Sequence, residues 1–148
     1  SSLPRPPAAY VPYSTSARVL HLSGHLAYRD GQPWVGKLGQ TLDVAEGAEA
    51  ARLIGIQLIS TLDEATRAAG LSLDAIEGIN KIVVLVNSTP DFTEPHRVAN
   101  GCSDLLNAVF EERGRHARSA FSVTQLPLGV CVEIELIATL AQDPRSHA

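Results

Sequence analysis

Two charged residues, Arg118 and Glu133, lie in adjoining strand-like runs, residues 118–125 and 130–138. The sequence between the runs, Leu-Pro-Leu-Gly, combines a proline and a glycine in a way that is typical of a hairpin turn. Side chains alternate between the faces of a strand, so aligning the apolar sets that contain Phe121 and Val132 places Arg118 and Glu133 on the opposite, shared face. A cation, two carboxylates and two hydroxyls then share one sheet face, which makes that face the strongest candidate for a functional site. Its members are Arg118, Ser122, Thr124, Cys131, Glu133 and Glu135.

A solvent-exposed outer face is the simpler interpretation of the same alternation, because antiparallel sheets commonly have one polar face. The run Ile82–Val86 favours a different answer, since it is apolar at every position and therefore indicates a strand buried on both faces. The chain offers too few helices to cover both faces of the sheet. We therefore expect a second subunit to cover the polar-looking face.

The composition indicates one ordinary globular domain spanning residues 1–148, with an extended segment at 1–12 and a polar tail at 142–148. The net charge of −4 argues against partners such as nucleic acid or an anionic membrane surface. No long uncharged apolar run and no signal-peptide pattern occur, so we expect a cytoplasmic protein. Two cysteines, Cys102 and Cys131, do not form a disulfide framework and are expected to be reduced thiols.

The predicted elements follow the order β-β-α-β-α-β-β. The first strand is predicted at 18–22, and Asp30-Gly31 has the composition of a hairpin turn that leads to a returning strand at 34–35. The first helix is predicted from apolar residues at steps of three or four, beginning after Thr41 or Asp43 and ending before Gly70. The second helix is predicted to begin at a Thr93 cap and to end before Gly114. Two helices on one face of a mixed, mostly antiparallel sheet define an α+β two-layer sandwich.

Several kinds of site are absent from the sequence, including Gly-rich phosphate loops, HExxH, CxxC and GxSxG motifs. The five histidines lie in unrelated places, so we expect no metal site and no cofactor. Cys102 falls on the apolar side of a helix and is interpreted as a packing residue. Arg113, Arg115 and Arg118 form a basic cluster that could contact phosphates, although such clusters in acidic chains are more often solvated.

From about Tyr13 to Leu140 the chain resembles the RidA family (also called YjgF), small proteins that hydrolyse reactive enamines and imines. The resemblance rests above all on Ala-Arg-Ser-Ala at 117–120, Leu-Pro at 126–127 and Val-Glu-Ile-Glu at 132–135. Further matching segments are 11–13, 22–25, 69–71 with Asp74, and 90–92. The resemblance implies a chorismate-mutase-like fold and a homotrimer with active clefts between subunits.

The resemblance also implies roles for individual residues. Arg118 matches an arginine that clamps the substrate carboxylate, a task suited to a planar bidentate donor. Glu133 matches a glutamate that positions the attacking water. The positions matching cleft residues are Tyr13, Ser23 and Gly24, and the backbone of Ala120 matches a group facing the substrate nitrogen. The chain departs from the family at 100–106, at 114–117, where the usual proline is missing, and at His25, where glutamine is common.

Three functions remain open at this point. The first is hydrolysis of 2-imino or enamine acids to 2-keto acids and ammonia, for which the partner is a small carboxylate metabolite. The altered pocket walls favour a second, a non-catalytic metabolite-binding or holdase protein of the same fold. The third is an endoribonuclease, against which the acidic charge and the lack of an aromatic and basic stripe weigh.

Overall fold

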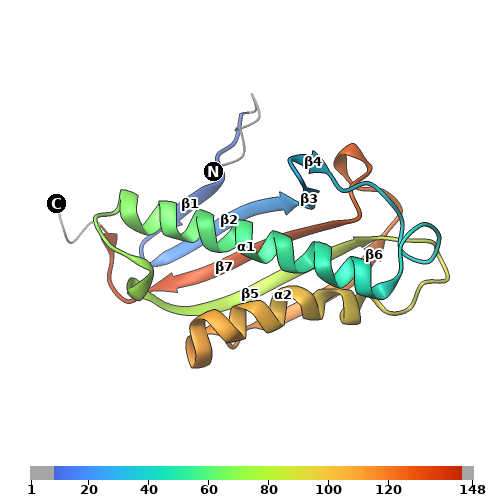
Figure 1. Ribbon diagram of the computed structural model, residues 1–148. Coiled ribbons are helices and arrows are strands. Elements are labelled where there is room, and N and C mark those ends of the chain that lie inside the picture. The colour runs from blue at the N-terminus through green and yellow to red at the C-terminus, as the bar shows by residue number, and fades with distance from the viewer. Residues whose placement is uncertain (1–8, 145–148) are drawn as a thin grey trace.

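The computed structural model describes residues 9–144. Two long helices, α1 (Val44–Ala68) and α2 (Pro95–Phe110), lie side by side on one face of a five-stranded sheet (Figure 1). The sheet order is β1-β2-β7-β5-β6, and only β5 and β6 pair in parallel. The strand bounds are β1 Tyr13–Ser16, β2 Val19–Leu26, β5 Ile76–Asn87, β6 Ala117–Val123 and β7 Val132–Leu140. The predicted two-layer α+β sandwich is confirmed, whereas β1 was not predicted; the predicted segments 1–12 and 142–148 lie largely outside the described residues.

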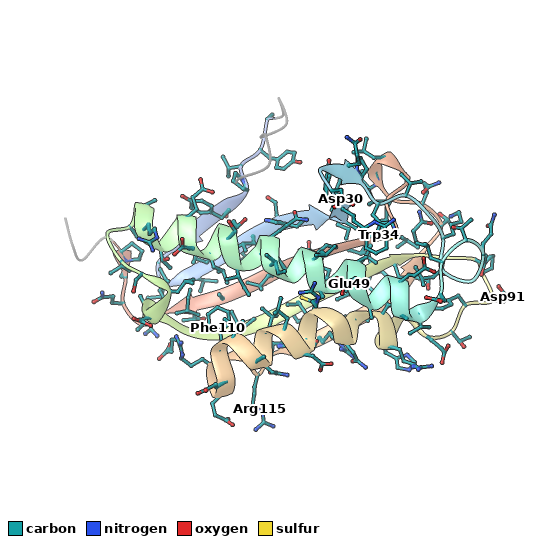
Figure 2. All side chains as sticks on the ribbon, in the orientation of Figure 1. Asp30, Trp34, Glu49, Asp91, Phe110 and Arg115 are labelled. Atoms are coloured by element: carbon teal, nitrogen blue, oxygen red, sulfur yellow. The ribbon has the colours of Figure 1, made fainter. Side chains whose placement is uncertain are left out.

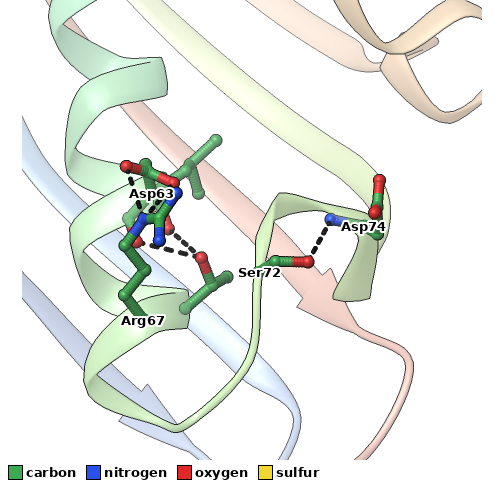
Figure 3. Close-up of polar contacts among 6 residues, drawn as sticks. Asp63, Arg67, Ser72 and Asp74 are labelled. Carbon is green, nitrogen blue, oxygen red and sulfur yellow. Dashed lines mark hydrogen bonds and ion pairs between the residues drawn. The ribbon is translucent and has the colours of Figure 1, made fainter.

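Both ends of α1 are formed by residues that the sequence indicates. Asp43 caps the helix by accepting from the Glu46 backbone N–H at 2.8 Å, while the Glu46 side chain accepts from the Asp43 N–H at 3.1 Å. Gly70, with φ of 76°, follows the helix in the left-handed region. In the last turns of α1, Arg67 donates to Asp63 (Figure 3). Beyond Gly70, Ser72 accepts from the Asp74 N–H to begin the 3₁₀ turn η1 (Leu73–Ala75), which leads into β5.

The second helix begins differently from the prediction. Glu94 occupies the cap position, no side chain caps the helix, and Pro95 stands at its first position. Thr93 is therefore not the cap. Proline suits this position because its fixed φ matches the helix and its missing N–H would be unpaired there anyway.

The small hairpin of β3 (Tyr28–Arg29) and β4 (Gln32–Pro33) turns at Asp30-Gly31, as predicted, with φ of 54° and 77°. Both central residues of a type I′ turn require positive φ. Trp34 follows and carries the Arg29 guanidinium 4.0 Å from its ring centroid. The predicted strand at 34–35 is reduced to a single bridge between Val35 and Val130.

Residues 118–138 do not form a hairpin. β6 and β7 lie on opposite sides of β5, so the connection between them crosses the end of that strand. Buried Asn87, the last residue of β5, holds this connection by donating to the Gln125 side chain at 2.7 Å and to the Val130 carbonyl at 3.1 Å. The short turn η3 (Pro127–Gly129) lies within the connection, with Leu128 at φ of 61°. The Pro and Gly mark a turn in a crossover rather than a hairpin.

The two helices cross at very close range. Gly101 of α2 packs on the backbone of Ala48 of α1, where an added Cβ would lie 2.7 Å from the Ala48 carbonyl carbon. A real side chain at position 101 would push the helices apart. Glycine therefore sets how closely α2 approaches α1.

Candidate functional site

Arg118 and Glu133 point to opposite faces of the sheet, which contradicts the predicted shared face. Arg118 pairs with Ile82, which is fully buried beneath the helices. Glu133 pairs with Leu85, which lies on the face that the helices leave bare; we call this the uncovered face. The error came from Phe121, whose apolar side chain was assigned to the core but lies on the uncovered face with 46% exposure.

The Glu133 carboxylate lies against the backbone of Gly24. A Cβ at Gly24 would fall 2.9 Å from the carboxylate carbon of Glu133, so only glycine admits the carboxylate there. Burial raises the pKa of Glu133, and repulsion by Glu135 raises it further. A carboxylate with a raised pKa is a better proton acceptor than an ordinary one.

A bulge in β2 creates this contact. The pairing of β2 with β7 slips by one residue between Leu22 and His25, and Ser23 and Gly24 occupy the slip. The Ser23 backbone N–H donates to Pro12 O at 2.9 Å and its hydroxyl donates to Val11 O at 2.6 Å. The structure thus brings Ser23, Gly24 and Glu133 together.

Tyr13 lies on the neighbouring strand, in register with the core residue Leu22, and packs against the core. It adjoins the bulge through β1 but is not on the Glu133 side of the sheet. Ala120 lies on the helix side of β6, two residues from Arg118 and in register with Val84. Apart from Tyr13, the predicted residues therefore divide into two groups, one around Glu133 and one around Arg118, with β5 between them.

Arg118 is held by neutral acceptors. Its Nη1 donates to Asn100 Oδ1 at 2.9 Å and to Ser103 Oγ at 3.1 Å, both on α2. Five other arginines of the described chain pair with carboxylates: Arg18 with Glu77, Arg52 with Glu49, Arg67 with Asp63, Arg97 with Glu94 and Arg115 with Glu112. Arg113 donates to backbone carbonyls and Arg29 lies over the Trp34 ring. Within residues 9–144 Arg118 has no such ion pair, so its charge is available to an anionic ligand.

A hollow of about 250 Å³ opens beside Arg118, between α2 and β6. We call it the Arg118 hollow; it is lined by Ser103, Asn107, Arg115, His116 and Arg118. No carboxylate lines it, and the Arg115 side chain is 76% exposed and projects from the end of the helix layer (Figure 2). The lining chemistry suits a small acid.

Asn100, Ser103 and His116 were not among the predicted site residues. Asn100 and Ser103 are spaced three apart on α2 and therefore face the same way, a signal that the sequence did contain. His116, by contrast, gave no local sign of its partners. The three residues belong to segments noted only as departures from the family pattern.

Three further features of the described residues concern the cysteines, the metal-binding side chains and the helices. Both cysteines are free, and burial raises the pKa of Cys102 to about 12 and that of Cys131 to about 11, so neither is a ready nucleophile. No cluster of three or more metal-binding side chains occurs among residues 9–144. Within the same residues, neither helix is long and apolar enough to span a membrane.

Comparisons with known proteins point to one family. Residues 4–140 match the family described as "YjgF/chorismate_mutase-like, putative endoribonuclease". Protein TCP17 of Trypanosoma cruzi is 45% identical over 137 residues, covering 91% of this chain and 83% of that protein. The structure of Atu1372 from Agrobacterium tumefaciens, a protein of unknown function, is 34% identical, with a TM-score of 0.83 and coverage of 90% and 84%. A Shewanella oneidensis structure described as a putative endoribonuclease is 32% identical, with a TM-score of 0.83 and coverage of 93% and 91%.

Proposed function

Because the chain belongs to the YjgF/chorismate-mutase-like family, we propose that it hydrolyses 2-imino acids and their enamine forms to 2-keto acids and ammonia. The observation that carries the proposal is the Arg118 guanidinium, which is held by two neutral acceptors and faces a hollow without a carboxylate. A guanidinium in this state is suited to bind the carboxylate of a small acid through two hydrogen bonds.

Glu133 supplies the second function, activation of water. The imine carbon is already electrophilic, so the protein needs to position a water and accept its proton. Water oxygen bonds to the carbon while Glu133 takes the proton and passes it to nitrogen. Glu133 then moves the hydroxyl proton of the resulting amino alcohol to its nitrogen, so that ammonia leaves as the C–N bond breaks and the C=O bond forms. The raised pKa of Glu133 brings its proton affinity closer to that required near neutral pH.

We propose that the two groups come from different copies of the chain. Arg118 lies on the helix side of the edge strand β6, and Glu133 lies on the uncovered face across β5, so one chain does not bring them together. The uncovered face also presents Val83, Leu85 and the half-exposed Phe121. We infer a homotrimer in which Arg118 of one copy meets Glu133 of the next, and sedimentation equilibrium should give close to three times 15.7 kDa.

Mixing inactive variants tests the shared site. Arg118→Ala should abolish both turnover of freshly generated 2-imino acids and binding of pyruvate, and Arg118→Lys should rescue little because ammonium lacks the planar fork. Glu133→Gln should retain pyruvate binding while hydrolysis slows about 10²-fold. Unfolding and reassembling Arg118→Ala with Glu133→Gln in equal amounts should restore about a quarter of wild-type activity, since one in four clefts then receives both native residues.

Two results would contradict the proposal. Pyruvate binding by a correctly assembled Arg118→Ala protein at wild-type affinity would remove Arg118 as the anchor. Full activity in a stable monomer would exclude a shared site. Arg118-dependent pyruvate binding without turnover of any imino acid would favour the metabolite-binding alternative, and RNA cleavage that survives further purification would favour the nuclease.

A further inference from the structure

His116 and Ser103 form a hydrogen-bonded chain that ends on Arg118. His116 Nδ1 lies 2.6 Å from the Gly114 carbonyl oxygen, and its Nε2 lies 2.8 Å from Ser103 Oγ. Ser103 Oγ in turn accepts from Arg118 Nη1 at 3.1 Å. Ser103 is buried, with 8% exposure, whereas His116 and Arg118 are half-buried.

With a neutral imidazole, the chemistry of these atoms gives the direction of each hydrogen bond. A carbonyl oxygen only accepts, so His116 Nδ1 must carry a proton and donate it to Gly114. In neutral imidazole, Nε2 is then an acceptor and takes the proton of the Ser103 hydroxyl. The lone pairs of Ser103 consequently face Arg118, and the serine acts as an acceptor toward the guanidinium.

Holding Nη1 has a geometric consequence for Arg118. Both protons of Nη1 are used, one toward Asn100 and one toward Ser103. Nε and Nη2 make no hydrogen bond with any residue in the described part of the chain, and together they form a flat edge with two parallel N–H groups. This edge is a bidentate donor for a carboxylate.

His25, at the end of the bulge in β2, makes the same pair of bonds. Its Nδ1 lies 2.6 Å from the Ser23 carbonyl oxygen and its Nε2 lies 2.7 Å from Thr61 Oγ1 on α1. Each histidine thus links the carbonyl two residues before it to a hydroxyl on the covering helix. Only the His116 chain continues to a charged group, Arg118.

We propose that Ser103 and His116 are positioning residues for Arg118: His116 orients the Ser103 hydroxyl so that its oxygen holds Nη1, leaving the Nε–Nη2 edge to bind the ligand carboxylate. The inference rests on the proposed role of Arg118. It assigns to both residues an effect on carboxylate affinity without contact with the reacting carbon.

Two similar substitutions at His116 separate its two bonds. Gln places an amide oxygen where Nε2 lies and can still accept from Ser103, whereas Asn reaches only the Nδ1 position and keeps the Gly114 bond. Each variant loses one hydrogen bond, so their thermal stabilities should fall by similar amounts. Pyruvate affinity should stay within about two-fold of wild type in His116→Gln and weaken about ten-fold in His116→Asn.

Kinetics with 2-imino acids should distinguish the two His116 variants in the same way. His116→Asn should have a raised KM and a nearly unchanged kcat, whereas His116→Gln should resemble wild type. Ser103→Ala should behave like His116→Asn, and it provides the measurement if one histidine variant fails to fold. His96→Gln, at an exposed position in the first turn of α2, is the matched control and should match wild type.

Equal pyruvate affinities in His116→Asn and His116→Gln would overturn the inference, because the bond to Ser103 would then have no influence on Arg118. Wild-type affinity in Ser103→Ala would overturn it as well. Arg118→Ala, measured in the same assay, keeps the two proposals apart: loss of pyruvate binding there with unchanged binding in all Ser103 and His116 variants would leave the anchor role intact and reject only the positioning role.

Discussion

Gly24→Ala is the substitution that separates the position of the Glu133 carboxylate from the stability of the fold. Gly24 does not have a positive φ, so an alanine backbone is allowed at this position. The new Cβ would lie 2.9 Å from the carboxylate carbon and 3.2 Å from Cγ of Glu133. Ordinary carbon contacts are about 3.5–4.0 Å, so the carboxylate must retreat by roughly 1 Å.

We expect Gly24→Ala to lower the catalytic rate rather than the stability. Displacing a reacting group by about 1 Å can lower a rate by about 10²-fold, so kcat for 2-imino acids should fall by between ten- and a hundred-fold. The end of a glutamate side chain moves easily, so we expect a strain of about 1 kcal/mol. The smaller freedom of alanine in the unfolded chain offsets about 0.4–1 kcal/mol of that strain. The free energy of unfolding should therefore change little.

Gly78→Ala is the matched control. Gly78 is also a sheet glycine without a positive φ, and its added Cβ would lie 3.8 Å from the Arg113 carbonyl oxygen, an ordinary contact. Turnover with freshly generated imino acids, pyruvate affinity and thermal unfolding should be measured on both variants. Wild-type turnover in a folded Gly24→Ala protein would refute the reasoning, because the Glu133 carboxylate could then move from its observed position without loss of activity.

Three further expectations concern charge. Glu135→Gln removes the lesser cause of the raised pKa of Glu133, so the acid limb of the pH–rate profile should move to lower pH, though burial should keep the pKa above its ordinary value. Burial lowers the pKa of His25 below 6.5, so folded-state stability should fall as the pH drops below that value, and His25→Gln should flatten this decline in thermal unfolding scans. Arg115→Ala should weaken pyruvate binding only a few-fold, and less at high salt, because this exposed guanidinium is screened by solvent and paired with Glu112.

Where an element is determined by residues close together in the sequence, the sequence was sufficient to predict it. The spacing of apolar residues in α1 and Gly70 at its end are each determined within a few residues, and both are confirmed. Of the two predicted caps, Thr41 and Asp43, the structure has Asp43. The turn at Asp30-Gly31 is equally local. The layer arrangement followed because two amphipathic helices need a sheet to cover.

Pairings between distant segments could not be predicted in the same way. Pro127 and Gly129 are compatible with a hairpin and with a crossover, and the choice depends on Asn87, which binds the connection at the end of β5. Placing β7 beyond β5 reversed the expected relation between Arg118 and Glu133. The partners of His116 and His25 lie 13 and 36 residues away, so their spacing along the chain could not indicate them.

The backbone contact between Gly101 and Ala48 has a practical consequence for redesign of the ligand specificity. Because α2 cannot sink deeper onto α1, exchanging side chains along its outer surface should not shift the helix as a whole. Asn107 lies on α2 and Arg115 just beyond the turn that follows it, and both line the hollow without holding Arg118. A library confined to these two positions can therefore vary the size and charge of the bound acid while the anchor keeps its place.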